Sequence, residues 1–205
     1  MTSLRSFKLG VVFAIVAFSV SACGGSVTPP PNFFVLSTPD GLVAEKPTKK
    51  RSTDISLGVG PIVLPPHLDR PQIVTKSTRH KIDLDEFNQW AEPLKDNFTR
   101  VLAENLSILL GTDRVAIYPW RSSIPIGYQV SAEVVRFDGQ LGGNSTLIVR
   151  WNVFGKGGRE ILFTRRSVFT KRSNGTSFEG MVSAMSDTIA AFSREIAAAT
   201  GALAP

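Results

Sequence analysis

The sequence predicts an α+β fold, a single domain with a mostly antiparallel mixed sheet and two amphipathic helices packed on one face. Two stretches, Leu94 to Gly111 and Thr176 to Gly201, repeat apolar residues at spacings of three and four, the period of an amphipathic helix. Between them, several runs rich in β-branched and aromatic residues are separated by glycine turns. Helices beside a series of hairpin-connected strands are typical of an α+β layer.

Two strands are expected before the first helix. "FFVLS", Phe33 to Ser37, is a short one, and "ISLGVGPIVLP", Ile55 to Pro65, is a longer one. Because proline has no N–H for a strand ladder, Pro61 restricts part of the second strand to a sheet edge or a bulge.

The first helix is expected in "LKDNFTRVLAENLSILLG". Proline is favoured at the start of a helix and glycine just after its end, so this helix begins near Pro93 and ends at Gly111. Its core-facing side collects the positions spaced by three and four: Leu94, Phe98, Val101, Leu102, Asn105, Leu106 and Leu109.

Four strand-like runs follow: "VAIYPW" from Val115, "YQVSAEVVRFDG" from Tyr128, "STLIVRWNVFG" from Ser145 and "EILFTRRSVFTK" from Glu160. The turns "DGQLGG" and "GKGG" join the last three runs as consecutive antiparallel hairpins. Apolar and polar residues alternate in the run from Tyr128, so we expect one buried and one wet face.

The second helix closes the chain. Thr176 and Glu179 fit a capping box at its start. Its apolar stripe consists of Phe178, Met181, Met185, Ile189, Phe192 and Ile196. We expect this stripe to pack in the core, although methionines on a helix also suit a partner or a lipid.

Residues 1–22 have the three parts of a secretory signal. Arg5 and Lys8 give a positive start, and the apolar run from Leu9 to Val20 leads into small residues. As a helix this run spans about 18 Å, which is too short for a hydrocarbon core of roughly 30 Å. The segment therefore indicates export and cleavage and not a permanent membrane span.

The single cysteine of the chain, Cys23, follows directly in "VSAC", which resembles the bacterial lipobox. A thiolate is a strong nucleophile, which suits a residue that receives a diacylglycerol and, after cleavage, an N-acyl chain. Two or three chains hold a protein firmly to a membrane. Residues 23–32 would be the lipidated cysteine and a Pro/Gly tether, and residues 33–200 the domain. Gly24, in place of the aspartate that retains many lipoproteins in the inner membrane, favours the outer membrane with the domain facing the periplasm.

The charge balance narrows the class of partner. The whole chain has a formal net charge of +6, and 21 basic and 17 acidic residues remain without the signal, a charge of +4. In an exported protein this balance favours anionic headgroups or acidic partner surfaces and not nucleic acid. The basic stretch "EKPTKKRSTD", Glu45 to Asp54, is either a solvated loop or such a contact.

The sequence offers no catalytic constellation. His67 and Asp69 with scattered serines lack the nucleophile elbow of a hydrolase. "HKIDLDE", His80 to Glu86, is more typical of solvated charges in a polar loop than of a metal site. "GVGP" lacks the lysine and the following helix of a phosphate-binding loop. We therefore expect no enzymatic activity, no metal and no cofactor beyond the acyl chains on Cys23.

Four motifs follow the lipobox in a fixed order: "GVGPIVLPPHLDRPQIV" from Gly58, "WAEPL" from Trp90, "VLAENLSILLG" from Val101 and "YPW" from Tyr118. Together they closely resemble the PqiC/YmbA family of ABC-type transport auxiliary lipoproteins, over about Phe33 to Ala198. The resemblance implies an outer-membrane lipoprotein that works with an MCE-domain protein and inner-membrane components to move lipids between the two membranes. In some members the lipoprotein docks on an MCE tube as a ring of identical copies. The family brings no catalytic residues.

A stand-alone lipid carrier or outer-membrane assembly lipoprotein is the alternative function. It would need an apolar cavity for an acyl chain inside the domain. The lipid, the direction of transport and the type of partner system, PqiA-like or an MCE ABC transporter, stay open. Trp90 and Trp120 are expected as core anchors, with a contact surface as the alternative.

The proline-rich stretch is the candidate docking surface. Its prolines from Pro61 to Pro71 remove backbone donors and fix φ, so we expect an extended, preordered segment that costs little entropy to dock. The candidate contact residues are Pro65, Pro66, Leu68, Asp69, Arg70 and Pro71. Alternatively, Asp69 and Arg70 pair locally and the prolines only shape a surface turn.

Overall fold

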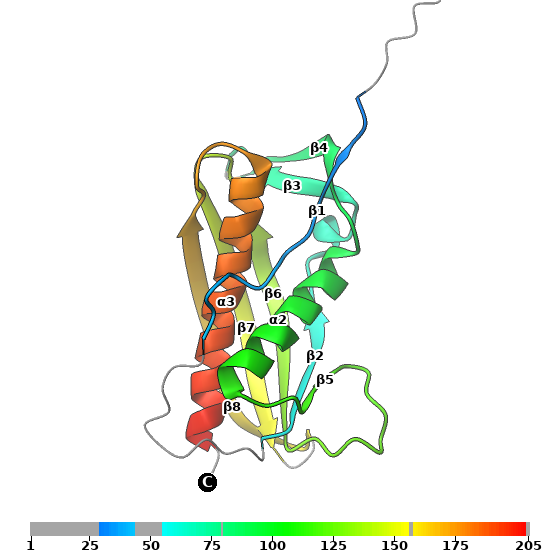
Figure 1. Cartoon of the computed structure of the whole chain (residues 1–205), viewed down its shortest axis with the longest axis vertical. Helices are drawn as coiled ribbons and strands as arrows, with labels where there is room; N and C mark the ends of the chain where they lie inside the picture. Colours follow the sequence, from blue (N-terminus) through cyan, green and yellow to red (C-terminus); the bar gives the residue numbers. More distant parts are fainter. Residues whose placement is uncertain (1–28, 44–54, 79, 156–157, 204–205) are drawn as a thin grey trace, which may run out of the picture. The chain divides into compact units, whose positions relative to one another are not determined.

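Two sheets and two helices make up the described part of the chain (Figure 1). The computed structural model describes residues 29–43, 55–78, 80–155 and 158–203, and residues 31–205 form one unit. Cys23 and the basic stretch Glu45 to Asp54 lie outside the described residues. The predicted α+β class with helices on one face of a mixed sheet is confirmed, but a second, smaller sheet joins the predicted one.

The larger sheet has five strands in the order β5–β2–β6–β7–β8. Their bounds are Leu57–Val63 for β2, Val115–Ile117 for β5, Tyr128–Asp138 for β6, Asn144–Gly155 for β7 and Glu160–Arg172 for β8. The predicted hairpins are confirmed, since β6, β7 and β8 pair antiparallel. β2 instead runs parallel to both β5 and β6. Parallel neighbours need a long crossover connection, and here that connection includes a helix.

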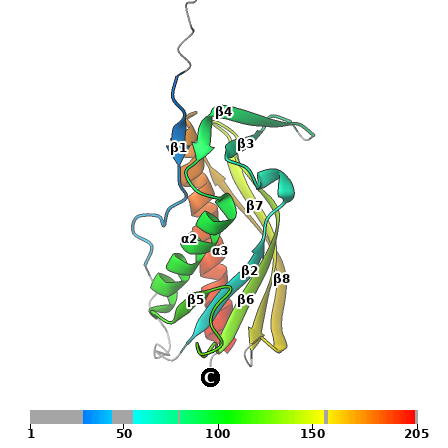
Figure 2. The ribbon, with the colours of Figure 1, turned by 90° about the vertical axis from the view of Figure 1, so that its right-hand side faces the viewer.

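Helices α2 (Leu94–Leu110) and α3 (Phe178–Leu203) cover one face of this sheet (Figure 2). α2 contacts β2 and β5, α3 contacts β6, β7 and β8, and the two helices contact each other. α2 begins after Pro93 and ends at Gly111 in the left-handed conformation, with φ of 62°, as the sequence predicts.

The predicted capping box of α3 is wrong by one residue. The N–H of Gly180 donates to the Oγ of Ser177 at 3.1 Å, so Ser177 caps the helix and Thr176 does not. Gly180 also lies so close to Asn174 that a Cβ would stand 2.1 Å from its carbonyl oxygen. This tight approach sets where the chain enters the helix, and a threonine–glutamate spacing in the sequence does not reveal it.

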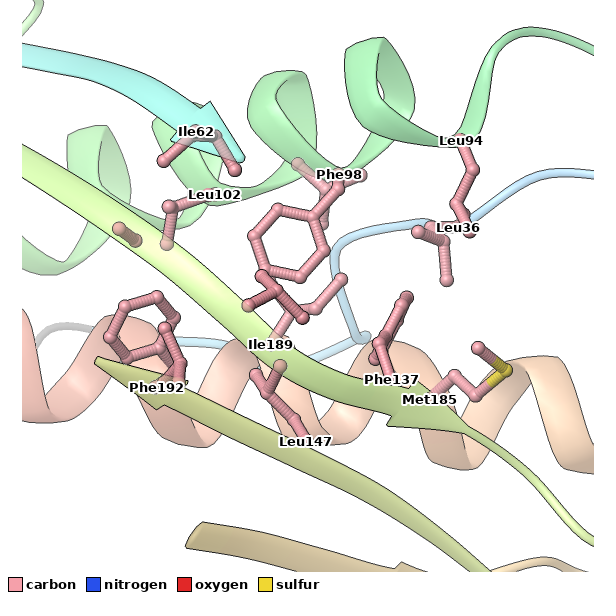
Figure 3. Close-up of a cluster of buried hydrophobic side chains, with 14 of the residues drawn as sticks. Leu36, Ile62, Leu94, Phe98, Leu102, Phe137, Leu147, Met185, Ile189 and Phe192 are labelled. Atoms are coloured by element: carbon pink, nitrogen blue, oxygen red, sulfur yellow. The ribbon is translucent and has the colours of Figure 1, made fainter. Parts of the chain in front are cut away.

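The core lies between the helices and the larger sheet (Figure 3). The buried side chains of α3 confirm the predicted stripe, because Met181, Met185, Ile189, Phe192 and Ile196 are all buried and Phe178 packs against them. The sheet contributes alternate residues such as Phe137, Leu147 and Trp151. The methionines of α3 therefore serve packing and not a partner or a lipid.

The smaller sheet has the order β1–β4–β3, with β1 at Asn32–Phe34, β3 at Gln72–Lys76 and β4 at Ile82–Trp90. The prediction that His80 to Glu86 form a polar loop is wrong, since most of this stretch is strand β4. Ile82 and Leu84 alternate with Asp83 and Asp85, which is the period of a strand. Because charged residues alternate with the apolar ones, the stretch is interpreted from the sequence as a polar loop and not as a strand.

Candidate docking surface

The pairing of β2 with β5 ends before Pro61, while Ile62 and Val63 stay paired with β6. β5 pairs only with Leu57 to Val59, and the register between β2 and β6 shifts between Val59 and Ile62. Gly60 makes this turn possible with φ of 121°, and a Cβ there would stand 2.7 Å from the Cβ of Tyr118. The predicted edge and the predicted bulge at Pro61 are thus both present.

The expectation of an extended proline segment is wrong between Pro66 and Leu68. These residues form one 3₁₀ turn, in which the N–H of Leu68 donates to the carbonyl of Pro65 at 2.9 Å and the N–H of Asp69 to that of Pro66 at 3.1 Å. Proline suits the first position of a helical turn because its missing N–H would be unbonded there. The turn places Leu68, which is 2% exposed, in the core. Leu68 therefore shapes the surface from beneath and is not presented to a partner.

The other candidates lie on or near the surface. Asp69 and Pro71 are exposed, and the carbonyl of Pro71 accepts the N–H of Trp90 at 2.7 Å, which ties the segment to β4. Arg70 is half-buried, and its Nε has no hydrogen-bond partner. Within the described part of the chain, no ion pair joins Arg70 to Asp69, so the local pairing considered from the sequence is not seen.

A groove of about 290 Å³ opens beside the proline turn, on the face of the sheet that the helices leave uncovered. Its walls are Val63, Leu64, Pro65 and Pro66 on one side and Glu133, Val134, Val135 and Arg150 on the other. Val63 is 54% exposed although it is apolar, and Val135 is also exposed. The groove thus offers an apolar floor with one acidic and one basic side chain at its rim.

The rim charges are weakly paired. Arg150 Nη1 lies 3.7 Å from Glu133 Oε1, and both side chains are largely exposed, so this pair contributes little to stability. Farther along β6, Arg136 forms two 2.7 Å hydrogen bonds with the carboxylate of Asp138. These bonds raise the pKa of the Arg136 guanidinium, against the effect of its partial burial. Arg136 is therefore held by its neighbour, whereas Arg150 is free to exchange Glu133 for another acceptor.

Sequence reasoning missed the β6 and β7 residues of this groove. A signal was present in "AEVVRF", where two successive valines break the alternation of the strand. The register of β6 with β7 shifts between Val134 and Arg136, so Val135 is the extra residue of a bulge. Val135 is exposed in step with Glu133, and the bulge keeps Arg136 partly exposed as well, so that Phe137 is buried again.

The two tryptophans of the motifs have different surroundings. Trp90 is buried in the core, as predicted. Trp120 is half-buried and packs over Gly58, where a Cβ would stand 2.6 Å from the indole ring. Gly58 lies between Leu57 and Val59, which face the helices, so Trp120 covers the opposite face of β2. It is not the core anchor that the sequence led us to expect.

The ionisable groups considered from the sequence are dispersed. His67 and His80 are both exposed. Asp85 accepts hydrogen bonds from the N–H groups of Phe87 and Asn88 and from the Asn88 amide, and so it holds the irregular part of β4, where the pairing with β3 shifts register. In residues 29–43, 55–78, 80–155 and 158–203, no group of three or more His, Cys, Asp or Glu could hold a metal ion. Neither helix of these ranges is long and apolar enough to cross a membrane.

Comparison with solved structures supports the fold. A crystal structure of an uncharacterized protein matches with a TM-score of 0.67 and 17% identity, covering 84% of this chain and 99% of that one. A crystal structure of a protein from Xanthomonas campestris also matches with a TM-score of 0.67, at 15% identity, covering 82% of this chain and 94% of that one. A search of curated proteins found no match.

The family itself is defined by sequence. The family model described as the ABC-type transport auxiliary lipoprotein component matches residues 34–197, which include both sheets from the end of β1 and most of α3. This family is an auxiliary component of transport systems and not a known family of enzymes. The chain therefore belongs to the ABC-type transport auxiliary lipoprotein family.

Proposed function

We propose that this chain is a non-enzymatic lipoprotein subunit of an MCE-type system that moves lipids between the inner and outer membranes. The protein is anchored in the outer membrane through acyl chains on Cys23, faces the periplasm and docks on the MCE-domain component. The observation that carries the docking role is the open apolar groove between the proline turn and the β6 bulge. It lies on the sheet face without helices, where a partner can reach it.

The groove suits a partner side chain better than an acyl chain. Pockets that enclose a small ligand usually have volumes of about 300–1,000 Å³ and bury most of the ligand. The groove, at about 290 Å³, is at the lower limit of this range, and it is open and not enclosed. Among the described residues, one contiguous cluster of buried hydrophobic side chains lies between the helices and the larger sheet. These features favour the transport subunit over the stand-alone lipid carrier.

The polar groups around the groove give a partner its orientation. Arg150 and Glu133 lie at the rim, and Arg70 is half-buried in the proline-rich segment next to the groove. An acidic group on the partner would pair with the Arg150 guanidinium or with the exposed part of the Arg70 guanidinium, and such charge pairs fix the register of an interface. Asp69, Pro65, Pro66 and Pro71 would then form the outer edge of the contact.

Co-purification in mild detergent tests the docking role, with the full mature lipoprotein and its MCE partner. Val63→Glu and Val135→Glu each place a charge in the apolar groove. We expect binding about tenfold weaker or worse, because a desolvated, unpaired charge costs several kcal/mol. Val168→Glu is the matched control, since Val168 is also 54% exposed and lies on the same sheet face in β8. Equal binding by all three variants would contradict the docking surface.

Arg70→Glu tests the polar side of the same surface. We expect it to weaken the complex while the melting temperature of the lipoprotein changes little, since Arg70 has no ion pair with Asp69 to lose. Light scattering on the same samples counts the copies and shows whether a ring forms. An intact complex with folded Arg70→Glu protein would exclude Arg70 from the contact.

Mass spectrometry tests the anchor. The mature protein should begin at Cys23 and carry the mass of a diacylglycerol and an N-acyl chain. Cys23→Ala should leave the signal uncleaved and the protein without lipid. A wild-type protein that retains Met1 or a free Cys23 thiol would exclude the lipid anchor. Recovery in the inner-membrane fraction would exclude the outer-membrane location.

A further inference from the structure

The tether reaches the domain at the smaller sheet. Only nine residues lie from Gly24 to Asn32, and β1 begins at Asn32, paired with Asn88 of β4. A fully extended chain of this length spans about 30 Å. If Cys23 carries acyl chains, as in the proposed function on which this inference rests, the smaller sheet cannot move far from the lipid headgroups.

Apolar side chains are exposed along this sheet. Ile82 and Leu84 are each 41% exposed, and they share one face of β4 because they are two residues apart. Phe87 and, on the neighbouring strand β1, Phe33 are exposed as well. Single exposed apolar residues are ordinary. Four of them in one small sheet at the end of a lipid tether indicate a surface that is buried against another molecule or a membrane.

The β3–β4 hairpin carries the groups that an interfacial contact needs. It projects beyond the larger sheet at the end where β1 lies (Figure 2). Lys76 is the cross-strand neighbour of Ile82, and Lys81 precedes it, 3.1 Å from Asp83. Lysine stems can lie along apolar surface while the ammonium groups stay among phosphates.

The acidic side chains of the hairpin are placed differently from its lysines. The carboxylate of Asp85 is occupied by the N–H groups of Phe87 and Asn88, and Glu86 lies nearer the base of the hairpin, 3.5 Å from the amide of Gln72. The tip therefore presents apolar and cationic groups with a single paired carboxylate, Asp83. Apolar burial, and not net charge, would drive the contact.

We propose that the smaller sheet rests on the phospholipid surface in which Cys23 is anchored, with Ile82 and Leu84 entering the interface. This contact would orient the domain so that the hairpin faces the membrane. Ile161 would face away from the membrane. It pairs with Phe154 near the end of β7. Tyr128 lies beside this position and donates its hydroxyl to the carbonyl of Leu203, at the end of α3 that is far from the hairpin.

A fluorescent probe on the full lipidated chain tests this orientation. Leu84→Cys and Ile161→Cys are labelled with a polarity-sensitive dye, which reacts at these sites because the sulfur of Cys23 holds lipid. Each protein is reconstituted into vesicles of phosphatidylethanolamine and phosphatidylglycerol, with ordinary or brominated acyl chains. We expect the Leu84 probe to shift to shorter wavelength and to be quenched by the brominated lipid, and the Ile161 probe to show neither effect. Ile82→Cys, equally exposed on the same face, gives a second probe if the first variant misfolds.

The outcomes separate this inference from the anchor. Protein that floats with the vesicles while the Leu84 probe stays unshifted overturns the orientation and leaves the anchor intact. A shift without quenching means that protein, such as a second copy, covers the hairpin, and this also overturns it. Protein that does not float overturns both the anchor and the inference. Equal quenching of the Leu84 and Ile161 probes would exclude the proposed orientation.

Discussion

The side-chain amide of Asn97 on α2 holds the backbone of Leu36, 61 positions earlier, by two hydrogen bonds. The N–H of Leu36 donates to Oδ1 at 2.6 Å, and Nδ2 donates to the carbonyl of Leu36 at 3.2 Å. Next to it, the N–H of Ser37 donates to the Oγ of Ser186 on α3 at 3.2 Å. Leu36 itself is buried in the core. The segment that leads from the tether is thus bound to both helices.

Asn97→Ala should destabilise the protein by about 1–3 kcal/mol, because it leaves a buried N–H and a buried carbonyl without partners. Urea unfolding followed by circular dichroism measures the loss. Asn144→Ala, at an exposed asparagine in β7, is the control and should change stability by less than about 0.5 kcal/mol. Equal midpoints for the two variants would mean that the amide of Asn97 is dispensable.

Phe192→Ala should cost about 3–5 kcal/mol, a large part of the roughly 5–15 kcal/mol of a typical domain. The Phe192 ring lies edge-on to Trp151 at 5.7 Å and near Phe169 at 5.8 Å between centroids. Removal of the ring would leave a cavity between α3 and the sheet. Thermal melting gives the comparison, with Phe33→Ala as the exposed control of the same type. A melting temperature equal to that of the control would contradict burial of Phe192.

Gly58→Ala should displace the indole of Trp120, since the new Cβ would stand 2.6 Å from it. We expect a loss of about 1–3 kcal/mol and easier quenching of tryptophan fluorescence by iodide. The increase in quenching should be absent in a Trp120→Phe background. Gly201→Ala, where a Cβ meets nothing within 4 Å, should leave both quantities nearly unchanged. Unaltered quenching in Gly58→Ala would show that the ring does not cover β2 in solution.

Asp83 should titrate below its ordinary pKa of 3.8. Hydrogen bonds from Ser77 and then from Lys81 lower the pKa of its carboxyl group in the folded hairpin. A group with a lowered folded pKa stabilises the fold above its unfolded pKa, and this contribution is lost as the pH falls through the folded value. NMR titration of the Asp83 carboxyl carbon measures the midpoint. A midpoint at or above 3.8 would contradict these hydrogen bonds, and Lys81→Met should raise it.

The elements that the sequence predicted well are those with an uninterrupted period. The stripes of α2 and α3 repeat over several turns, and the glycine turns between β6, β7 and β8 separate long alternating runs. Such elements can be predicted from neighbouring residues alone. The proline before α2 and the glycine after it, for example, affect only the adjacent turns of the helix.

The pairing of distant strands could not be predicted in the same way. β1 pairs with β4 and β2 with β6, and no local signal specifies a partner more than fifty residues away. The link between β8 and α3 is similar. Ser167 accepts the indole N–H of Trp151 and donates to Glu195, which also bonds Arg165. These side chains meet only after the hairpin has folded beneath the helix.

The candidate docking surface was half predicted. Pro65 and Pro66 do line the groove, but Leu68 is buried because proline favoured a 3₁₀ turn over the extended chain that we expected. Val63 and Val135 come from strands that meet only in the folded sheet. A sequence motif can mark one wall of a groove, whereas the opposite wall depends on tertiary structure.

The charges on the last strand of the larger sheet affect whether copies of the protein aggregate when many of them lie close together on a membrane. β8 ends the sheet in the described chain, and its thirteen residues include Arg165, Arg166, Lys171 and Arg172. A long unpaired edge is a template for aggregation by strand addition, and a lipid anchor would gather many copies in two dimensions. Two such edges that approached each other would bring cations together before their backbones could bond. With the proposed anchor in place, the arginines and lysine of β8 would allow dense packing of the protein on a membrane without the growth of shared sheets.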